Sequence, residues 1–105
     1  MNKITYWQQG DVLGTKLQSL PVGEKKVIAQ HKCIVAHGES GHCHVIEDNE
    51  AELLQIGEKM ILSLKNQATL VHEEHGPITL DPGLWEIGQV KEFDHLSAMV
   101  RPVQD

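Results

Sequence analysis

The stretch that decides the fold class is residues 26–37, Lys-Val-Ile-Ala-Gln-His-Lys-Cys-Ile-Val-Ala-His. Four of its alternate positions carry small or apolar side chains, namely Val27, Ala29, Cys33 and Val35. Side chains two residues apart project from the same face of a strand, so this pattern predicts one long, half-buried strand. On that prediction His31 and His37 lie on its apolar face.

The chain on either side of this stretch is divided by turn-forming residues about every 8–12 positions. These turn signals are Gln9-Gly10-Asp11, Pro21-Val22-Gly23, residues 38–41, Asp48-Asn49, Gly57-Glu58, Asn66, Gly76-Pro77 and Asp81-Pro82-Gly83. Short apolar segments between them predict further strands at residues 12–16, 42–47, 51–55, 60–64, 68–74, 78–80, 84–93 and 98–103. Residues 48–56 tolerate helical geometry, but about two turns of helix are marginal alone, and a strand is predicted there. The pattern predicts an all-β fold, a single small barrel or sandwich of mostly antiparallel strands.

Size and charge narrow the classes of function. A chain of 105 residues suffices for one modest core, so residues 1–105 are expected to form a single β domain. The formal charge of −6 is scattered along the chain and disfavours nucleic-acid binding, which needs clustered cations. No apolar run approaches the roughly 20 residues of a membrane-spanning helix, and the first residues lack a secretory apolar segment. We therefore expect no membrane partner and a cytoplasmic location.

Histidines form the candidate functional residues. The chain has seven of them, and four stand in two tight groups, Gly-His-Cys-His at 41–44 and His-Glu-Glu-His at 72–75. On an extended segment His42 and His44 project to one face while Cys43 points away, so the two imidazoles can bind one ion. Imidazole suits Zn, Fe, Ni and Cu. Cys33 and Cys43 form no Cys-x-x-Cys pair, and in a reducing compartment such thiols are expected to be small buried apolar residues.

The second group differs from the zinc-protease pattern, whose two histidines are four apart on a helix. Here they are three apart, and the β-branched lead-in with a following Gly-Pro favours a strand running into a turn. On that strand His72 and Glu74 share a face, and His75 lies at the turn. The remaining ligands are then either His72 with His75, or His72 with a carboxylate from Glu47, Glu73 or Glu74.

Part of this pattern resembles the metal motifs of cupins. His42-x-His44 followed by Glu47 is similar to their first motif, in which two histidines and a glutamate bind one divalent ion. Residues 78–83, ending in Asp81-Pro82-Gly83, resemble the strand and turn of their second motif. The spacing to Glu47 is one residue short, and the histidine expected after the second turn is absent, so His72 or His75 would have to replace it. The segments Gln-Gly-Asp-Val, Gly-His-x-His and His-Glu-Glu-His equally resemble an uncharacterised bacterial family of short β proteins, which implies no activity.

The leading hypothesis is a small metal-binding β protein with a histidine-ligated divalent ion, Zn, Fe, Ni or Mn. Its expected ligands are His42, His44 and His72, completed by His75 or by a glutamate, Glu47 or Glu74. Any chemistry would be metal-assisted and act on a small polar substrate or ligand. The alternative is a non-enzymatic binding or assembly module without a metal, since a short all-β chain with exposed edges often forms homo-oligomers.

Overall fold

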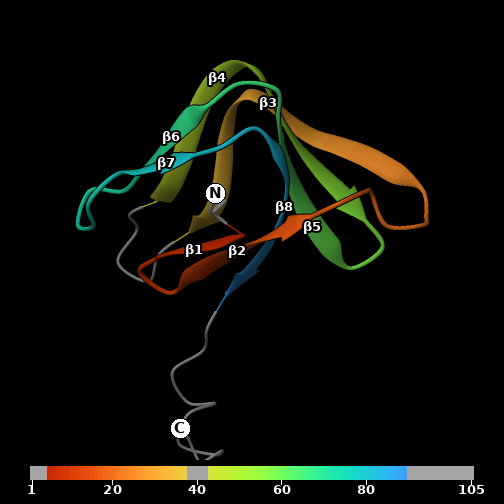
Figure 1. Cartoon of the computed structure of the whole chain (residues 1–105), viewed down its shortest axis with the longest axis horizontal. Helices are drawn as coiled ribbons and strands as arrows, with labels where there is room; N and C mark the ends of the chain where they lie inside the picture. Colours follow the sequence, from red (N-terminus) through yellow and green to blue (C-terminus); the bar gives the residue numbers. More distant parts are fainter. Residues whose placement is uncertain (1–4, 38–42, 90–105) are drawn as a thin grey trace, which may run out of the picture.

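The computed structural model describes residues 5–37 and 43–89, which form eight strands and no helix (Figure 1). The side chain of His37 is outside this description. The all-β prediction is confirmed for these residues. The strands are β1 (Tyr6–Gln9), β2 (Val12–Leu17), β3 (Lys25–His37), β4 (Cys43–Ile56), β5 (Lys59–Leu64), β6 (Ala68–Val71), β7 (Ile78–Leu80) and β8 (Gly83–Gln89).

The strands pair antiparallel in the order β1-β2-β8-β5-β4-β6-β7, with β3 paired to β4. The sheet curls so that its two ends share one core: Trp7 of β1 and Leu80 of β7 belong to the same buried cluster. The result is a nearly closed, barrel-like sheet (Figure 1). The main cluster contains apolar side chains from all eight strands, including Cys33, Ile46, Leu62, Leu70 and Trp85.

The long strand β4 organises this sheet. One of its edges pairs with β3, while the other pairs with β5 over Glu52 to Ile56 and with β6 at Val45 and Ile46. The turn expected at Asp48-Asn49 is therefore wrong, as is the division into two strands, because β4 runs as one continuous strand from Cys43 to Ile56 and is paired with its neighbours on both sides of these residues. The helical alternative for residues 48–56 is excluded for the same reason.

Strand β3 is irregular. Its register against β4 shifts at three places, between Val27 and Ala29, between Gln30 and Lys32, and between Ile34 and Ala36. His31, at the second shift, has a positive φ of 69° and an exposed side chain, so its predicted place on the apolar face is wrong. A bulge adds a residue to one strand only, and the alternation of faces restarts after it. Cys33 and Val35 are buried as predicted, whereas Val27 is exposed.

Other strands differ from the prediction or cannot be compared with it along their whole length. Strand β1 was not expected from the sequence. Strand β6 ends at Val71, so residues 72–74 are not in a strand and His72 and Glu74 do not share a strand face. The strand predicted at 84–93 is confirmed over residues 84–89 as part of β8 (Gly83–Gln89), while residues 90–93 and the strand predicted at 98–103 lie outside the described residues.

Candidate functional site

Three imidazoles come together at one end of the barrel. His44 lies on β4, and His72 and His75 lie in the segment between β6 and β7. The ring centroids of His44 and His72 are 4.2 Å apart, those of His72 and His75 are 4.7 Å apart, and those of His44 and His75 are 6.2 Å apart. We call these three residues the histidine cluster.

Strand register and a glycine build the cluster. Val45 of β4 pairs with Val71, the last residue of β6, in the antiparallel ladder, so His44, just before Val45, and His72, just after Val71, lie side by side. His75 packs against the backbone of Gly10, where a Cβ would lie 2.6 Å from its Nε2 atom. Gly10 also has a positive φ of 60°, a conformation that favours glycine. Only glycine at this turn combines that backbone with room for the His75 ring.

His44 is the buried member of the cluster, with 1% of its surface exposed. Its Nδ1 atom lies 2.9 Å from Oε1 of Gln9, a residue of β1 that is itself only 2% exposed. The Gln9 Nε2 group donates to the carbonyl oxygens of Leu70 and Gly76, at 3.0 and 2.9 Å. Gln9 therefore connects β1 to β4 and to both ends of the segment that carries His72 and His75.

A carboxylate faces the other nitrogen of His44. Oδ1 of Asp11, in the turn between β1 and β2, lies 3.8 Å from His44 Nε2, while Asp11 Oδ2 accepts a hydrogen bond of 3.0 Å from Gln89 Nε2. Burial lowers the pKa of His44 from its ordinary value of 6.5, and the nearby His72 and His75 lower it further, against an opposing effect of Asp11. His44 is therefore neutral at physiological pH, the form that binds metals.

The structure brings together three of the six residues predicted as ligands, His44, His72 and His75. His42 lies outside the described residues. Glu47 is exposed on the face of β4 opposite His44 and lies beside Lys32 of β3. Glu74 is also exposed, and its backbone N–H donates a hydrogen bond of 3.0 Å to His72 Nδ1.

Two residues of this site were missed from the sequence, Gln9 and Asp11. The signal available was Gln9-Gly10-Asp11, which predicts a turn but does not say what that turn faces. As the side chains stand, the described residues contain no group of three or more histidine, cysteine or carboxylate side chains arranged to hold a metal ion. Nor do they contain a helix long and apolar enough to cross a membrane.

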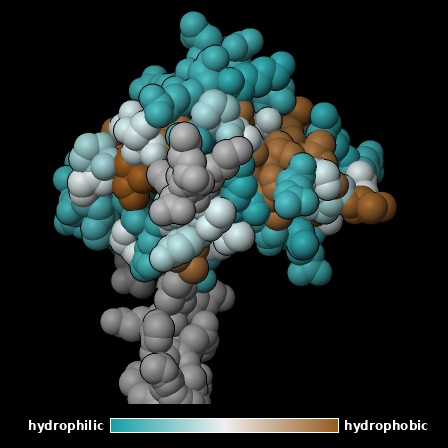
Figure 2. Space-filling view, viewed as in Figure 1, coloured by the Kyte–Doolittle hydropathy of each residue, from teal (hydrophilic) through white to brown (hydrophobic). Residues whose placement is uncertain are grey.

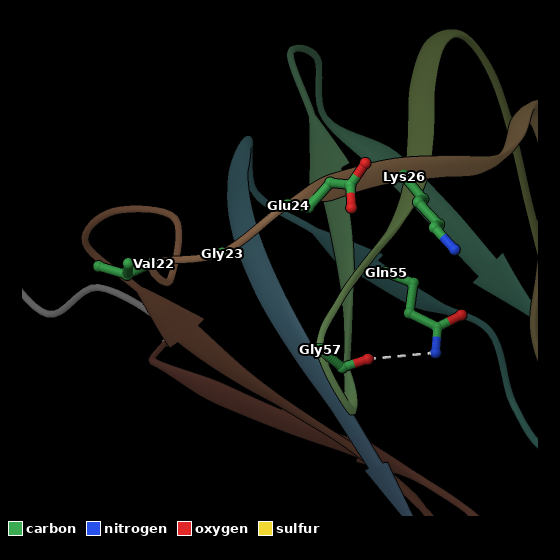
Figure 3. A pocket seen from close by; sticks show the side chains of 6 residues that line it. All are labelled: Val22, Gly23, Glu24, Lys26, Gln55 and Gly57. Atoms are coloured by element: carbon green, nitrogen blue, oxygen red, sulfur yellow. Dashed lines mark hydrogen bonds between the residues drawn. The ribbon is translucent and has the colours of Figure 1, made fainter.

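A groove of about 340 Å³ lies at the opposite end of β4 from His44. It is lined by residues of the loop before β3, of β3, of the end of β4 and of the β4–β5 turn: Val22, Gly23, Glu24, Lys26, Gln55 and Gly57 (Figure 3). Gln55 Nε2 donates to the Gly57 carbonyl oxygen at 3.3 Å. None of the histidine cluster lines this groove.

Comparison with known proteins identifies a family. The family described as Domain of unknown function (DUF8820) matches residues 8–89, so the chain belongs to that family. The matched range includes Gln9, Asp11 and the whole histidine cluster. No curated protein and no solved structure matches the chain.

Proposed function

We propose that this member of the DUF8820 family binds a divalent transition-metal ion between the histidine cluster and the carboxylate of Asp11. The observation that carries the proposal is the meeting of three imidazoles from β4 and the β6–β7 segment beside that carboxylate. Histidine and carboxylate are the ligands of reactive mononuclear sites of Zn, Fe and Ni.

The spacing of the rings supports this assignment. For Zn–N bonds of about 2.0–2.1 Å at tetrahedral angles, two ligating imidazoles have centroids about 5.2 Å apart. The three observed separations, 4.2, 4.7 and 6.2 Å, bracket that value. The rings are inclined to one another by 33°, 40° and 13°, so binding requires them to rotate until their nitrogen atoms point to a common centre.

Asp11 completes the set with small adjustment. Two ligand atoms bound to one tetrahedral ion about 2.05 Å away are about 3.3 Å apart, and about 3.6 Å apart at a trigonal angle. The distance of 3.8 Å between Asp11 Oδ1 and His44 Nε2 is only slightly longer. A shift of a few tenths of an ångström in the turn between β1 and β2 would close it.

The hydrogen bond that His72 loses on binding costs little compared with the binding energy of an ion. Whether it binds the ion through Nε2 or through Nδ1, His72 must give up the hydrogen bond that its Nδ1 accepts from the Glu74 N–H. One hydrogen bond contributes about 1 kcal/mol, whereas micromolar binding supplies about 8 kcal/mol. Three neutral imidazoles and one carboxylate also leave a five- or six-coordinate ion positions for water, as metal-assisted chemistry on a small polar substrate requires.

Metal binding is tested on protein purified without a nickel column and treated with chelator. Titration with Co²⁺ and Zn²⁺ in a calorimeter should give one ion per chain, and thermal unfolding should shift upward, because an ion at 100 times its Kd stabilises by about 2.7 kcal/mol. His44→Gln and Asp11→Asn should weaken binding, whereas the matched control His31→Gln, at an exposed site in β3, should not. Less than one ion per several chains, or binding unchanged in His44→Gln, would sink the proposal.

We propose self-association as a second candidate function, with another copy of this chain as the partner. Among the described strands β3 pairs with β4 alone, and exposed apolar side chains gather on the side formed by β3 and the loop before it (Figure 2). Val22 in that loop is fully exposed, at 102%. The neighbouring groove carries one anion and one cation, Glu24 and Lys26. In a two-fold interface the same patch faces itself, so Glu24 of each copy can meet Lys26 of the other.

Charge reversal tests this interface. In sedimentation velocity the dimer should weaken in Lys26→Glu and return in the double variant Glu24→Lys/Lys26→Glu, while Lys25→Glu, with the same change of net charge outside the groove, should behave as wild type. A monomer at all concentrations, or equal effects of the two lysine variants, contradicts the interface. Chelator should leave it unchanged, which separates it from metal-driven assembly.

A further inference from the structure

The hydrogen bonds around Gln9 determine which nitrogen of His44 carries a proton. Carbonyl oxygens only accept hydrogen bonds, so the group of Gln9 that faces the carbonyls of Leu70 and Gly76 must be the NH₂. The amide orientation is thereby fixed, and Oε1 is the atom directed at His44 Nδ1, 2.9 Å away. Because Oε1 can only accept, Nδ1 must carry the hydrogen.

We propose that Gln9 is a positioning residue that holds His44 in the tautomer protonated on Nδ1, leaving the lone pair of Nε2 directed to the metal. The metal half of this inference rests on the proposed function, but the tautomer is a property of the metal-free chain. Histidine ligands of metals commonly donate their second ring N–H to an oxygen, which fixes both tautomer and ring orientation.

Burial makes this control effective. Gln9 and His44 are 2% and 1% exposed, so water cannot replace the amide oxygen as the acceptor for Nδ1. All three hydrogen bonds of the Gln9 side chain are 2.9–3.0 Å long and connect segments that are distant in the sequence. The same contacts aim His44 Nε2 at Asp11 and tie the His72–His75 segment to β1 through Gly76.

His72 provides an internal comparison. Its Nδ1 accepts the N–H of Glu74, so in the neutral metal-free ring the proton is on Nε2. The structure thus assigns opposite tautomers to two neighbouring histidines. Of the two, only His44 has a tautomer already suited to binding through Nε2.

The experiment is long-range ¹H–¹⁵N NMR of ¹⁵N-histidine-labelled, chelator-treated chain at mildly alkaline pH, with the His44 signals assigned by the His44→Gln variant. Wild type should show His44 protonated on Nδ1. Gln9→Met should lose this preference and bind Co²⁺ about 10–100 times more weakly. Gln67→Met, the same chemical change at an exposed glutamine outside the site, should match wild type in both readouts.

Gln9→Glu separates orientation of His44 from simple tethering of strands. A carboxylate still accepts from Nδ1 but cannot donate to Leu70 and Gly76, so this variant should keep the tautomer while losing stability. Circular dichroism checks folding of each variant. If Gln9→Met does not fold, the His44 tautomers measured in wild type and in Gln9→Glu test the role of Gln9.

Two results would overturn the role of Gln9: a wild-type His44 protonated on Nε2, or Co²⁺ affinity unchanged in folded Gln9→Met. A wild-type chain that binds no Co²⁺ but has His44 protonated on Nδ1, with that preference lost in Gln9→Met, would contradict the proposed function and support Gln9 as the residue that sets the tautomer.

Discussion

Replacing Gly14 by alanine should displace the Trp7 side chain and destabilise the barrel. Gly14 lies in β2 opposite Trp7 of β1, and a Cβ at this position would overlap the indole ring, well inside the 3.4 Å at which ordinary contact begins. Its φ is not positive, so steric overlap alone decides the effect. Trp7 is 5% exposed and its ring centroid is 6.5 Å from that of Trp85, so the ring must move within a filled core.

The loss of stability in Gly14→Ala can be estimated from two known kinds of core substitution. Forcing an extra carbon into a packed core costs about 1–3 kcal/mol, and removing a large aromatic side chain from one costs about 3–5 kcal/mol. Trp7 Nε1 is buried without a hydrogen-bond partner among the described residues, so a ring that moves toward water recovers part of the loss. We expect a decrease of about 2–4 kcal/mol in the free energy of unfolding, or at least about 8 °C in Tm for a domain of this size.

Urea unfolding followed by tryptophan fluorescence measures this change, with Gly88→Ala as the matched control. Gly88 is an exposed strand residue with no atom in the path of a Cβ, so alanine there should be neutral or stabilise by up to about 1 kcal/mol. In a Trp7→Leu background the cost of Gly14→Ala should shrink, because the clash has gone. Equal stabilities of Gly14→Ala and Gly88→Ala would refute the reasoning.

Three further predictions concern protonation, reactivity and strain. The pKa of His44 is lower in the folded than in the unfolded chain, so the free energy of unfolding of the metal-free protein should decrease as pH falls below 6.5. Urea titrations at several pH values should show the free energies of unfolding of wild type and His44→Gln becoming more alike in acid. Burial raises the pKa of Cys33, so a thiol reagent should label Cys43 first and Cys33 only as the chain unfolds; equal rates would contradict this. His31→Val should destabilise by about 1–2 kcal/mol through its positive φ, whereas His31→Gly should stay within about 0.5 kcal/mol of wild type; thermal melts compare them.

The fold class could be predicted because it depends on local features of the sequence, the turn-forming residues and the short apolar segments between them. Gly10 and Gly57 occupy tight turns with positive φ, as their neighbours in the sequence suggest, and the apolar segments between turns are too short for helices. The continuity of β4 could not be predicted. Asp48 and Asn49 favour turns, but they lie between residues that pair with β3, β5 and β6, and long-range pairing overrides local preference.

The sequence also could not predict which side chains of β3 face the core. Counting alternate residues from Val27 assigns His31 to the apolar side, but each register shift against β4 restarts the count. Such bulges depend on how β3 follows the curved edge of β4, which is a property of the assembled sheet. They also interrupt the edge of β3 that pairs with no other strand of the described residues, as native sheets do to limit uncontrolled strand addition.

The histidines of the candidate site could be predicted from the sequence, but their partners could not. Histidine groups are visible as composition, and the structure brings His44, His72 and His75 together. Their partners are visible only through topology, because Gln9 reaches across 35 residues to His44 and 61 residues to Leu70. A glutamine next to a turn gives no local sign of such contacts.

The turn between β1 and β2 supplies three consecutive contributions to the site. Gln9 hydrogen-bonds His44 Nδ1, the backbone of Gly10 receives the His75 ring, and Asp11 faces His44 Nε2. The pairing of Gln9 with Val12 leaves only Gly10 and Asp11 in the turn, so their positions are fixed by strand register. Inserting one residue here would therefore shift Asp11 relative to Gln9, separating the carboxylate from the imidazole even if the barrel still folds. Geometry at this site thus depends on the length of one turn as much as on the histidines themselves.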